Sequence, residues 1–315
     1  MGLLLISVLR TLIKRSLGDK QSMELIKAIA LQLGESNKPV VTEYDLGVIV
    51  SNLYRTKKFK GERIKTISKD FPSKRILLKN IAALLSNGVI QRQDTYFTVL
   101  GKKNYGPGEI MCSLDPFAYV SHISAMSFHG LTDRIPSSIY LSTPNQKRWR
   151  EFARERMEKD YGDKFQEFSM STLPKLTRPH VEKVGKFPVH IYSSVHAGAF
   201  KHVSDSILRV STIGRTFLDM LREPMLCGGM RHVMNVYKEH GKLYKTLIID
   251  ELNQHGNKIE KVRAGYLLEE LCNLRDERID EWLSNVERGG SRKLDPSAEY
   301  RPTYSERWCL SINVD

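Results

Sequence analysis

The spacing of apolar residues along the first hundred positions predicts two helices, a third helix and then a β-hairpin. The first helix is expected over 22–34, where it ends at a glycine. The second begins at Thr42, and Asp45 three residues later forms an acidic variant of the capping box. Residues 89–100 contain two short β-prone runs about a polar turn, a pattern typical of a hairpin.

The third helix is expected from Lys74 to Ser86, with Ser73 as its N-cap and Asn87-Gly88 at its end. The residues expected to form its buried stripe are Leu77, Ile81, Leu84 and Leu85. The residues outside that stripe are Lys74, Arg75, Lys79 and Ser86, and the short side chains Ala82 and Ala83 follow along the helix. A helix that enters the DNA major groove needs such a cationic outer face with short side chains beside it.

Helix, helix, basic segment, helix and hairpin is the order of a winged helix-turn-helix domain. The basic segment spans 55–65, and the hairpin brings Arg92 with Gln91 or Gln93 to the DNA backbone or minor groove. We therefore expect the DNA-binding residues to be Lys57, Lys58, Lys60, Arg63, Lys65, Ser73, Lys74, Arg75, Lys79 and Arg92. The alternative is a solvated helix face with ordinary surface lysines.

Beyond a linker at 102–108, helical and extended segments alternate without repeats. The expected helices are 116–129, 213–222, 231–240, 244–254 and 258–274, and 146–164 is a charged helix or a mobile loop. The expected strands are 138–141, 187–193, 207–211 and 308–314. The predicted fold class is α+β: an N-terminal winged helix-turn-helix domain at 1–105, then a larger mixed α/β C-terminal domain at 106–315.

The positive charge of the chain is concentrated in its first third. The 315 residues have a formal net charge of +13. Residues 1–105 contain 19 Lys and Arg against 8 Asp and Glu, a net charge of +11, whereas the remainder is close to neutral. A charge confined to one region favours a dedicated module for a polyanion such as nucleic acid, an anionic membrane surface or an acidic protein.

Cysteine spacing and hydropathy favour a cytoplasmic protein. The four cysteines are far apart and form no CxxC pattern, so we expect reduced thiols, with neither a zinc site nor a disulfide framework. Residues 1–20 are apolar at their start but lack the flanks of a signal peptide, and they predict an amphipathic N-terminal helix. No stretch is long enough to span a bilayer, so no membrane partner is expected.

The chain lacks the motifs of the common enzyme classes. It has no HExxH, no P-loop and no GxSxG. His122 and His129 lie seven apart on one expected helix, where packed or capping histidines are favoured over metal ligands. We therefore expect no catalytic residue, no cofactor and no metal, and the protein is not expected to be an enzyme.

Several stretches resemble the AbiEi family, the antitoxins of type IV toxin–antitoxin systems. Residues 119–132 (YVSHISAMSFHGLT) resemble a stretch of that family, and residues 139–143 match the strand that follows it. Residues 211–224, with Thr212, Arg215 and Asp219, resemble its next helix, although Gly214 stands where the family usually has Glu. Further matches are the helix that begins at Arg263, Leu294-Asp295-Pro296 and 308–313, whereas the first twenty residues and the charged insert around 146–168 lie outside the family pattern.

The resemblance implies a protein with two activities. The winged helix would repress its own operon by binding inverted repeats in double-stranded DNA, as a monomer or weak dimer that binds cooperatively. The C-terminal domain would counteract a nucleotidyltransferase-like toxin without requiring a stable complex. Thr212, Arg215, Asp219 and Arg263 are the motif residues of that domain, and the resemblance assigns them no role beyond the alternative of structural support.

Two other functions compete with this one. The first is a plain winged-helix repressor whose C-terminal domain binds a ligand or dimerises. The second is a nucleic-acid enzyme that uses the winged helix for targeting. A carboxylate nuclease needs two or three acidic residues and a lysine on adjacent strands, and the expected strands carry no such set.

Overall fold

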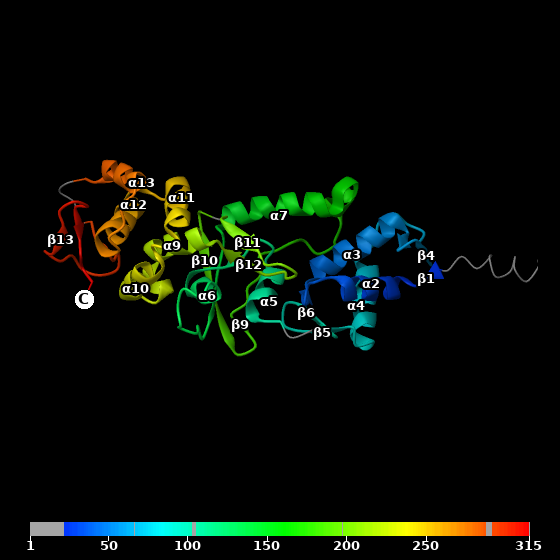
Figure 1. Cartoon of the computed structure of the whole chain (residues 1–315). Helices are drawn as coiled ribbons and strands as arrows, with labels where there is room; N and C mark the ends of the chain where they lie inside the picture. Colours follow the sequence, from blue (N-terminus) through cyan, green and yellow to red (C-terminus); the bar gives the residue numbers. More distant parts are fainter. Residues whose placement is uncertain (1–21, 66, 103–104, 197, 288–291, 315) are drawn as a thin grey trace, which may run out of the picture. The chain divides into compact units, whose positions relative to one another are not determined.

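Helices and short strands alternate along the chain, and the fold is mixed α+β (Figure 1). This computed structural model describes residues 22–65, 67–102, 105–196, 198–287 and 292–314. The helix expected over 1–20 lies outside these residues. The chain divides into two compact units, the first made of residues up to Tyr105 with Arg150–Pro179, and the second of Gly106–Trp149 with the residues from His180 onward.

The first unit contains three helices, two small sheets and a returning helical segment. Its elements are β1 (Ser22–Met23), α2 (Leu25–Glu35), β2 (Val40–Val41), α3 (Glu43–Thr56), β3 (Lys58–Phe59), β4 (Glu62–Ile64), α4 (Lys74–Ser86), β5 (Ile90–Arg92), β6 (Phe97–Val99), most of α7 (Gln146–Tyr161), the 3-10 turn η1 (Gly162–Lys164) and α8 (Phe165–Met170). Strands β2, β6 and β5 form one antiparallel sheet in that order, and β1, β4 and β3 form the other. The expected hairpin at 89–100 is confirmed as β5 and β6.

The expected helix boundaries in this unit hold where a capping side chain sets them. Thr42 and Asp45 form the predicted capping box at the start of α3. Ser73 caps α4, which runs over the predicted residues. The first helix begins three residues later than expected, because Ser22 and Met23 pair with β4 instead. Gly34 does not end this helix, because α2 continues to Glu35.

Residues 150–179 pack with the first unit, whereas the sequence analysis placed them in the second domain. The ring of Tyr161 stacks on that of Phe168 with centroids 3.7 Å apart, and both rings lie against Tyr44 of α3. The hydroxyl of Tyr44 donates to Asp160 at 2.9 Å. Burial of these aromatic rings explains why residues 150–179 pack with the first unit, because each large ring removed from water contributes about 1.5–3 kcal/mol to the stability of the fold.

The second unit is a six-stranded sheet followed by a helical layer. Its elements are α5 (Pro107–Leu114), β7 (Tyr119–Val120), α6 (His122–Phe128), β8 (Ile139–Pro144), β9 (Lys183–Val184), β10 (Phe187–Ser194), β11 (Phe200–His202), β12 (Arg209–Ser211), α9 (Ile213–Arg222), the 3-10 turn η2 (Pro224–Cys227), α10 (Met230–His240), α11 (Lys245–His255), α12 (Lys258–Gly265), the π-helix η3 (Tyr266–Leu271), α13 (Glu277–Asp280), the 3-10 turn η4 (Glu281–Asn285), β13 (Tyr304–Ser305) and β14 (Leu310–Ser311). The sheet order is β11-β12-β7-β8-β10-β9, with parallel pairing of β8 with β10 and of β7 with β12.

Three expectations for this unit were wrong. The strand expected over 308–314 is limited to the two residues of β14. The helix expected over 116–129 is a short strand, β7, followed by the shorter helix α6, because Tyr119 and Val120 pair with β8 and β12. The linker expected to reach residue 108 ends earlier, since Pro107 starts α5. A proline at the first helical position loses no hydrogen bond, so it begins a helix here rather than interrupting one.

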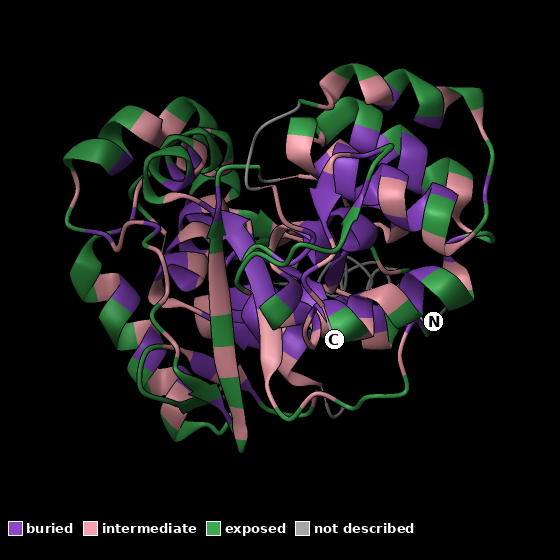
Figure 2. Cartoon of the chain, turned by 90° about the vertical axis from the view of Figure 1, so that its left-hand side faces the viewer, coloured by how far each residue is buried: buried purple, intermediate pink, exposed green. Residues whose placement is uncertain are grey.

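The helical layer closes around one apolar core built from α9 to η3 together with Trp308 and Leu310. Figure 2 shows the buried strands and inner helix faces in purple, with exposed green residues on the outer helix surfaces. Two glycines allow this packing. A Cβ on Gly265 would lie 2.1 Å from the Trp308 ring, and a Cβ on Gly214 would lie 2.4 Å from the Leu247 carbonyl oxygen of α11. Gly214 therefore lies at a point where α11 leaves no room for a side chain.

Candidate nucleic-acid interface

Helix α4 presents a cationic face over a buried apolar face. Leu77, Ile81 and Leu84 are buried as expected, whereas Leu85 is only half-buried. Lys74, Arg75 and Lys79 are all exposed, and none forms an ion pair within the described part of the chain. Their charges are therefore available to an external anion.

Ser73 has a defined structural task at the start of this helix. Its hydroxyl accepts a hydrogen bond from the backbone N–H of Ile76 at 3.4 Å, which satisfies one of the free donors of the first turn. Ser73 is also one of the residues expected to bind DNA. Its side chain is exposed, and its observed contact is the cap.

The β5–β6 hairpin holds Arg92 on its surface. The Arg92 guanidinium lies 4.8 Å from the centroid of the Phe97 ring, and Phe97 is its cross-strand partner. The ring is buried, so it supports the exposed arginine as a cation–π platform. Gln91 and Gln93 are exposed on either side of Arg92.

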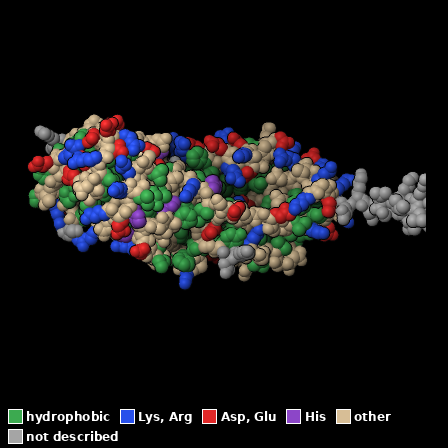
Figure 3. Space-filling model, viewed as in Figure 1, with side chains coloured by type: hydrophobic (Ala, Val, Ile, Leu, Met, Phe, Trp, Pro, Cys, Tyr) green, Lys and Arg blue, Asp and Glu red, His purple; other side chains and the backbone are tan. Residues whose placement is uncertain are grey.

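The basic segment between α3 and α4 forms the β3–β4 hairpin, which the sequence analysis did not predict. Lys57 pairs with Asp70 at 2.7 Å, and Lys60 pairs with Glu35. Lys58 and Arg63 are exposed and have no ion pair within the described residues. The face of the molecule in Figure 3 shows basic and acidic side chains interspersed.

The motif residues of the second unit form structural contacts, and all of them except the half-buried Thr212 are buried. Thr212 caps α9 by accepting from the Arg215 N–H at 3.3 Å. Arg215 Nε donates to Asp219 Oδ1 at 2.8 Å, and both side chains are almost fully buried. Because the pair is buried, removing either partner would leave an uncompensated buried charge, which is strongly destabilising. Arg263 donates to two backbone carbonyls, those of Lys293 and Leu221.

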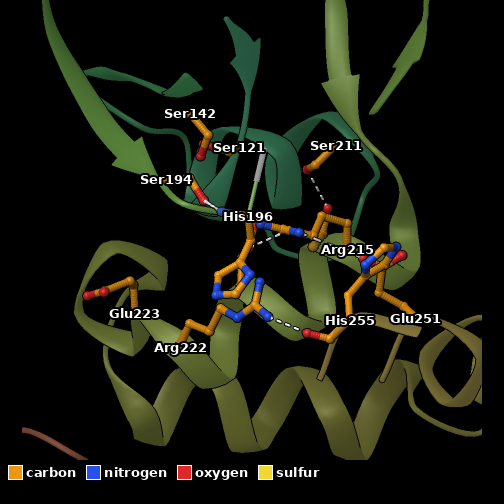
Figure 4. A network of polar contacts seen from close by, with 12 residues as sticks. Ser121, Ser142, Ser194, His196, Ser211, Arg215, Arg222, Glu223, Glu251 and His255 are labelled. Carbon is orange, nitrogen blue, oxygen red and sulfur yellow. Dashed lines mark hydrogen bonds and ion pairs between the residues drawn. The ribbon is translucent and has the colours of Figure 1, made fainter. Parts of the chain in front are cut away.

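Arg215 also belongs to a larger polar cluster in the second unit (Figure 4). Its Nη1 lies 3.9 Å from Glu251 Oε1, and Arg222 pairs with Glu260 at 2.8 Å. Figure 4 shows His196 facing Arg222, while Arg222 donates to the His255 carbonyl. These residues come from α9, α11, α12 and the loop after β10, so their spacing along the chain does not predict the cluster.

Several atoms of this cluster have no hydrogen-bond partner within the described residues. They are Tyr119 Oη, Asp219 Oδ2, Arg222 Nη1 and Glu251 Oε1. Burial raises the pKa of Tyr119 to about 12 and raises the pKa of Glu251 above its ordinary value. Unpaired buried groups of this kind cost about 1–3 kcal/mol each unless water reaches them.

The histidines do not form a metal site. His122 is the first residue of α6, is buried and contacts the hydroxyl of Ser121, whereas His129 lies after the helix end and bonds to the Ser211 carbonyl. Burial lowers the pKa of both imidazoles. The described residues contain no group of three His, Cys, Asp or Glu that could hold a metal ion.

Comparison with known proteins places the chain in no family. No protein-family model and no curated protein matches it. Among solved structures, the crystal structure of the RV2827C protein from Mycobacterium tuberculosis aligns over 90% of this chain and 89% of its own, with a TM-score of 0.48 and 12% identity. A similarity this distant supports no conclusion about function.

Among the described helices, none is both long and apolar enough to cross a membrane.

Proposed function

We propose that the chain is a transcriptional repressor that binds double-stranded DNA through a winged helix-turn-helix in its first unit. Helices α2, α3 and α4 with the β2-β6-β5 sheet have the order that this fold requires. In the proposal, α4 enters the major groove and the β5–β6 hairpin is the wing that carries Arg92 to the backbone or minor groove.

The observation that carries the proposal is the outer face of α4. Three cations, Lys74, Arg75 and Lys79, share the exposed side of a helix whose other side is buried. They have no carboxylate partner within the described residues, although the chain contains 36 Asp and Glu. Solvent-exposed surfaces usually carry interspersed charges of both signs. A face with cations alone is therefore better explained by binding of a polyanion.

The test is a binding titration of full-length protein with a duplex from upstream of its own gene. Lys74→Ala with Arg75→Ala is expected to abolish specific binding, because each lost contact at the groove costs about 1–3 kcal/mol. The matched control is Lys183→Ala with Lys186→Ala, which removes the same charge from exposed positions of the second unit. Undiminished binding by the α4 double variant, or equal losses in both variants, would contradict the proposal.

We further propose, from the resemblance to the AbiEi family, that the repressor is the antitoxin of a type IV system. It would bind the inverted repeats of its own operator and counteract a nucleotidyltransferase-like toxin encoded beside it. Co-expression of that toxin with the full-length Lys74→Ala, Arg75→Ala variant tests the two activities separately. Retained neutralisation without operator binding supports the antitoxin, whereas growth arrest with both the variant and the wild type would leave a plain repressor as the better description.

A further inference from the structure

The β3–β4 hairpin is a tight and well-defined element. Its two turn residues, Lys60 and Gly61, have φ of 49° and 85°, as a two-residue hairpin turn with left-handed residues requires. Strand β4 is central in its sheet, because β1 pairs with it on the other side. The backbone of the hairpin is therefore defined by its turn and by pairing on both sides of β4.

Two cations face one another across this hairpin. Lys58 and Arg63 are direct cross-strand partners, so their side chains lie on the same face of the sheet. Like charges in this arrangement destabilise a strand pair. Both side chains are exposed, and neither forms an ion pair within the described part of the chain.

Protection of a sheet edge does not account for this pair. A lysine on an edge strand disfavours pairing of that edge with a strand of another molecule, and Lys58 lies on the edge strand β3. Arg63 lies on the central strand, where that purpose does not apply. An anion bound between the two side chains would remove the repulsion.

The hairpin also lies near the helix that is proposed to enter the groove. Lys57, at the base of β3, pairs with Asp70 at 2.7 Å, and Asp70 comes three residues before the Ser73 cap of α4. Three residues span at most about 11 Å, so the base of the hairpin lies close to the first turn of α4. A DNA duplex presents one phosphate charge per ~1.7 Å of its axis, and phosphates therefore lie within reach on either side of a groove-bound helix.

We propose that Lys58 and Arg63 form a phosphate clamp, a second backbone contact beside α4 that adds affinity without reading sequence. This inference rests on the proposed DNA binding and divides the basic segment into two classes. Lys57 and Lys60 form ion pairs with Asp70 and Glu35, whereas Lys58 and Arg63 contact DNA.

The experiment is a titration of full-length protein over a series of KCl concentrations, with two labelled duplexes of equal length. One duplex comes from upstream of the chain's own gene, and the other is unrelated in sequence. Lys58→Ala with Arg63→Ala should lower the slope of log affinity against log salt by about 1.8, because each phosphate contact contributes about 0.9. Affinity should fall by the same factor for both duplexes, since phosphates carry no sequence information.

The matched control is Lys57→Ala with Lys60→Ala, which removes the same charge from the same hairpin. Its slope should change by less than half as much. Arg63→Glu is a second test variant, because it gives Lys58 a cross-strand partner of opposite charge. It should leave the melting temperature unchanged or higher while weakening binding to both duplexes, so that loss of binding cannot be attributed to unfolding.

The outcomes separate the clamp from the proposed function. Equal slopes for the Lys58, Arg63 variant and the control would overturn the clamp, while steep salt dependence in the wild type would still support DNA binding. A loss confined to the upstream duplex would also overturn the clamp, because it would indicate base reading. A wild type that binds neither duplex would overturn the proposed function and the clamp together.

Discussion

At the scale of single residues, the two units use charge in opposite ways. In the first unit, Lys74 and Arg75 are exposed and lack carboxylate partners among the described residues. In the second, Arg215 is buried and pairs with Asp219 at 2.8 Å. An exposed cation is available to a ligand, whereas a buried pair defines a packing arrangement and is expensive to break. Arg215, Asp219 and Arg263 are thus accounted for as structural residues by their contacts.

Glu251 gives a prediction about pH. Burial raises the pKa of its carboxyl, so the folded protein binds this proton more readily than the unfolded chain does. Its destabilising contribution is absent below the unfolded pKa of about 4.3 and develops as pH rises through the higher folded value. Glu251→Gln should therefore raise the melting temperature at pH 7 and have little effect near pH 4.

Thermal unfolding at both pH values measures this effect. Glu239→Gln is a suitable control, because Glu239 is an exposed carboxylate in the same unit. A lower melting temperature for Glu251→Gln at pH 7 would mean that the attraction to Arg215 outweighs the burial cost.

At the scale of elements, α4 depends on its first turn. Its stripe of Leu77, Ile81 and Leu84 anchors the helix, but the cationic residues lie at its N-terminal end. The positive pole of the helix dipole adds to the charge of Lys74 and Arg75 there. This repulsion destabilises the first turn of the free helix, and a bound anion would relieve it. The Ser73 cap therefore stabilises a turn that its own charges destabilise.

Ser73→Ala should lower the free energy of unfolding by about 1 kcal/mol, the usual cost of a lost N-cap. DNA affinity should fall as well, because Lys74 and Arg75 lie in the turn that frays. Chemical denaturation and a binding titration measure the two effects.

Ser86→Ala removes a hydroxyl from the opposite end of the same helix, where its bond goes to the Ala83 carbonyl. It should change neither quantity appreciably. Equal stability of the two variants would show that the 3.4 Å contact at Ser73 contributes little.

At the scale of the whole molecule, the chain leaves the first unit at residue 105 and returns to it at residue 150. The returning segment places Tyr161 and Phe168 against Tyr44 of α3. A fragment that ends at 105 would lose these contacts, and one that begins at 106 would carry the two rings without their partner. Experiments that divide the activities therefore need substitutions in the full chain.

Phe168→Ala should destabilise the first unit by about 3–5 kcal/mol, the usual cost of removing a buried phenylalanine ring. Phe165→Ala is the matched control, because Phe165 is only half-buried in the same helix. Unfolding and DNA binding are measured in the same denaturation series. Both the folded state and DNA binding should be lost at a lower denaturant concentration in Phe168→Ala than in Phe165→Ala. Coincident curves for the two variants would contradict the packing role of the returning segment.

Much of the first unit follows from local chemistry. The capping box at Thr42 and Asp45, the Ser73 cap, the stripe of α4 and the hairpin at 89–100 all involve residues within a few positions of each other. Interactions over so short a distance along the chain are visible as spacing. The excess charge of residues 1–105 is likewise a property of the sequence alone.

Tertiary structure decided what depends on distant partners. Ser22 and Met23 became a strand because β4 lies beside them, and Tyr119 and Val120 did so because they pair with β8 and β12. The cluster around Arg215 and Glu251 joins residues from different helices, and the returning segment joins residues more than a hundred positions apart. Burial and cross-strand pairing are properties of three-dimensional neighbours, so only the folded chain reveals them. The same holds for Lys58 and Arg63, two basic residues in the sequence that only the hairpin places face to face.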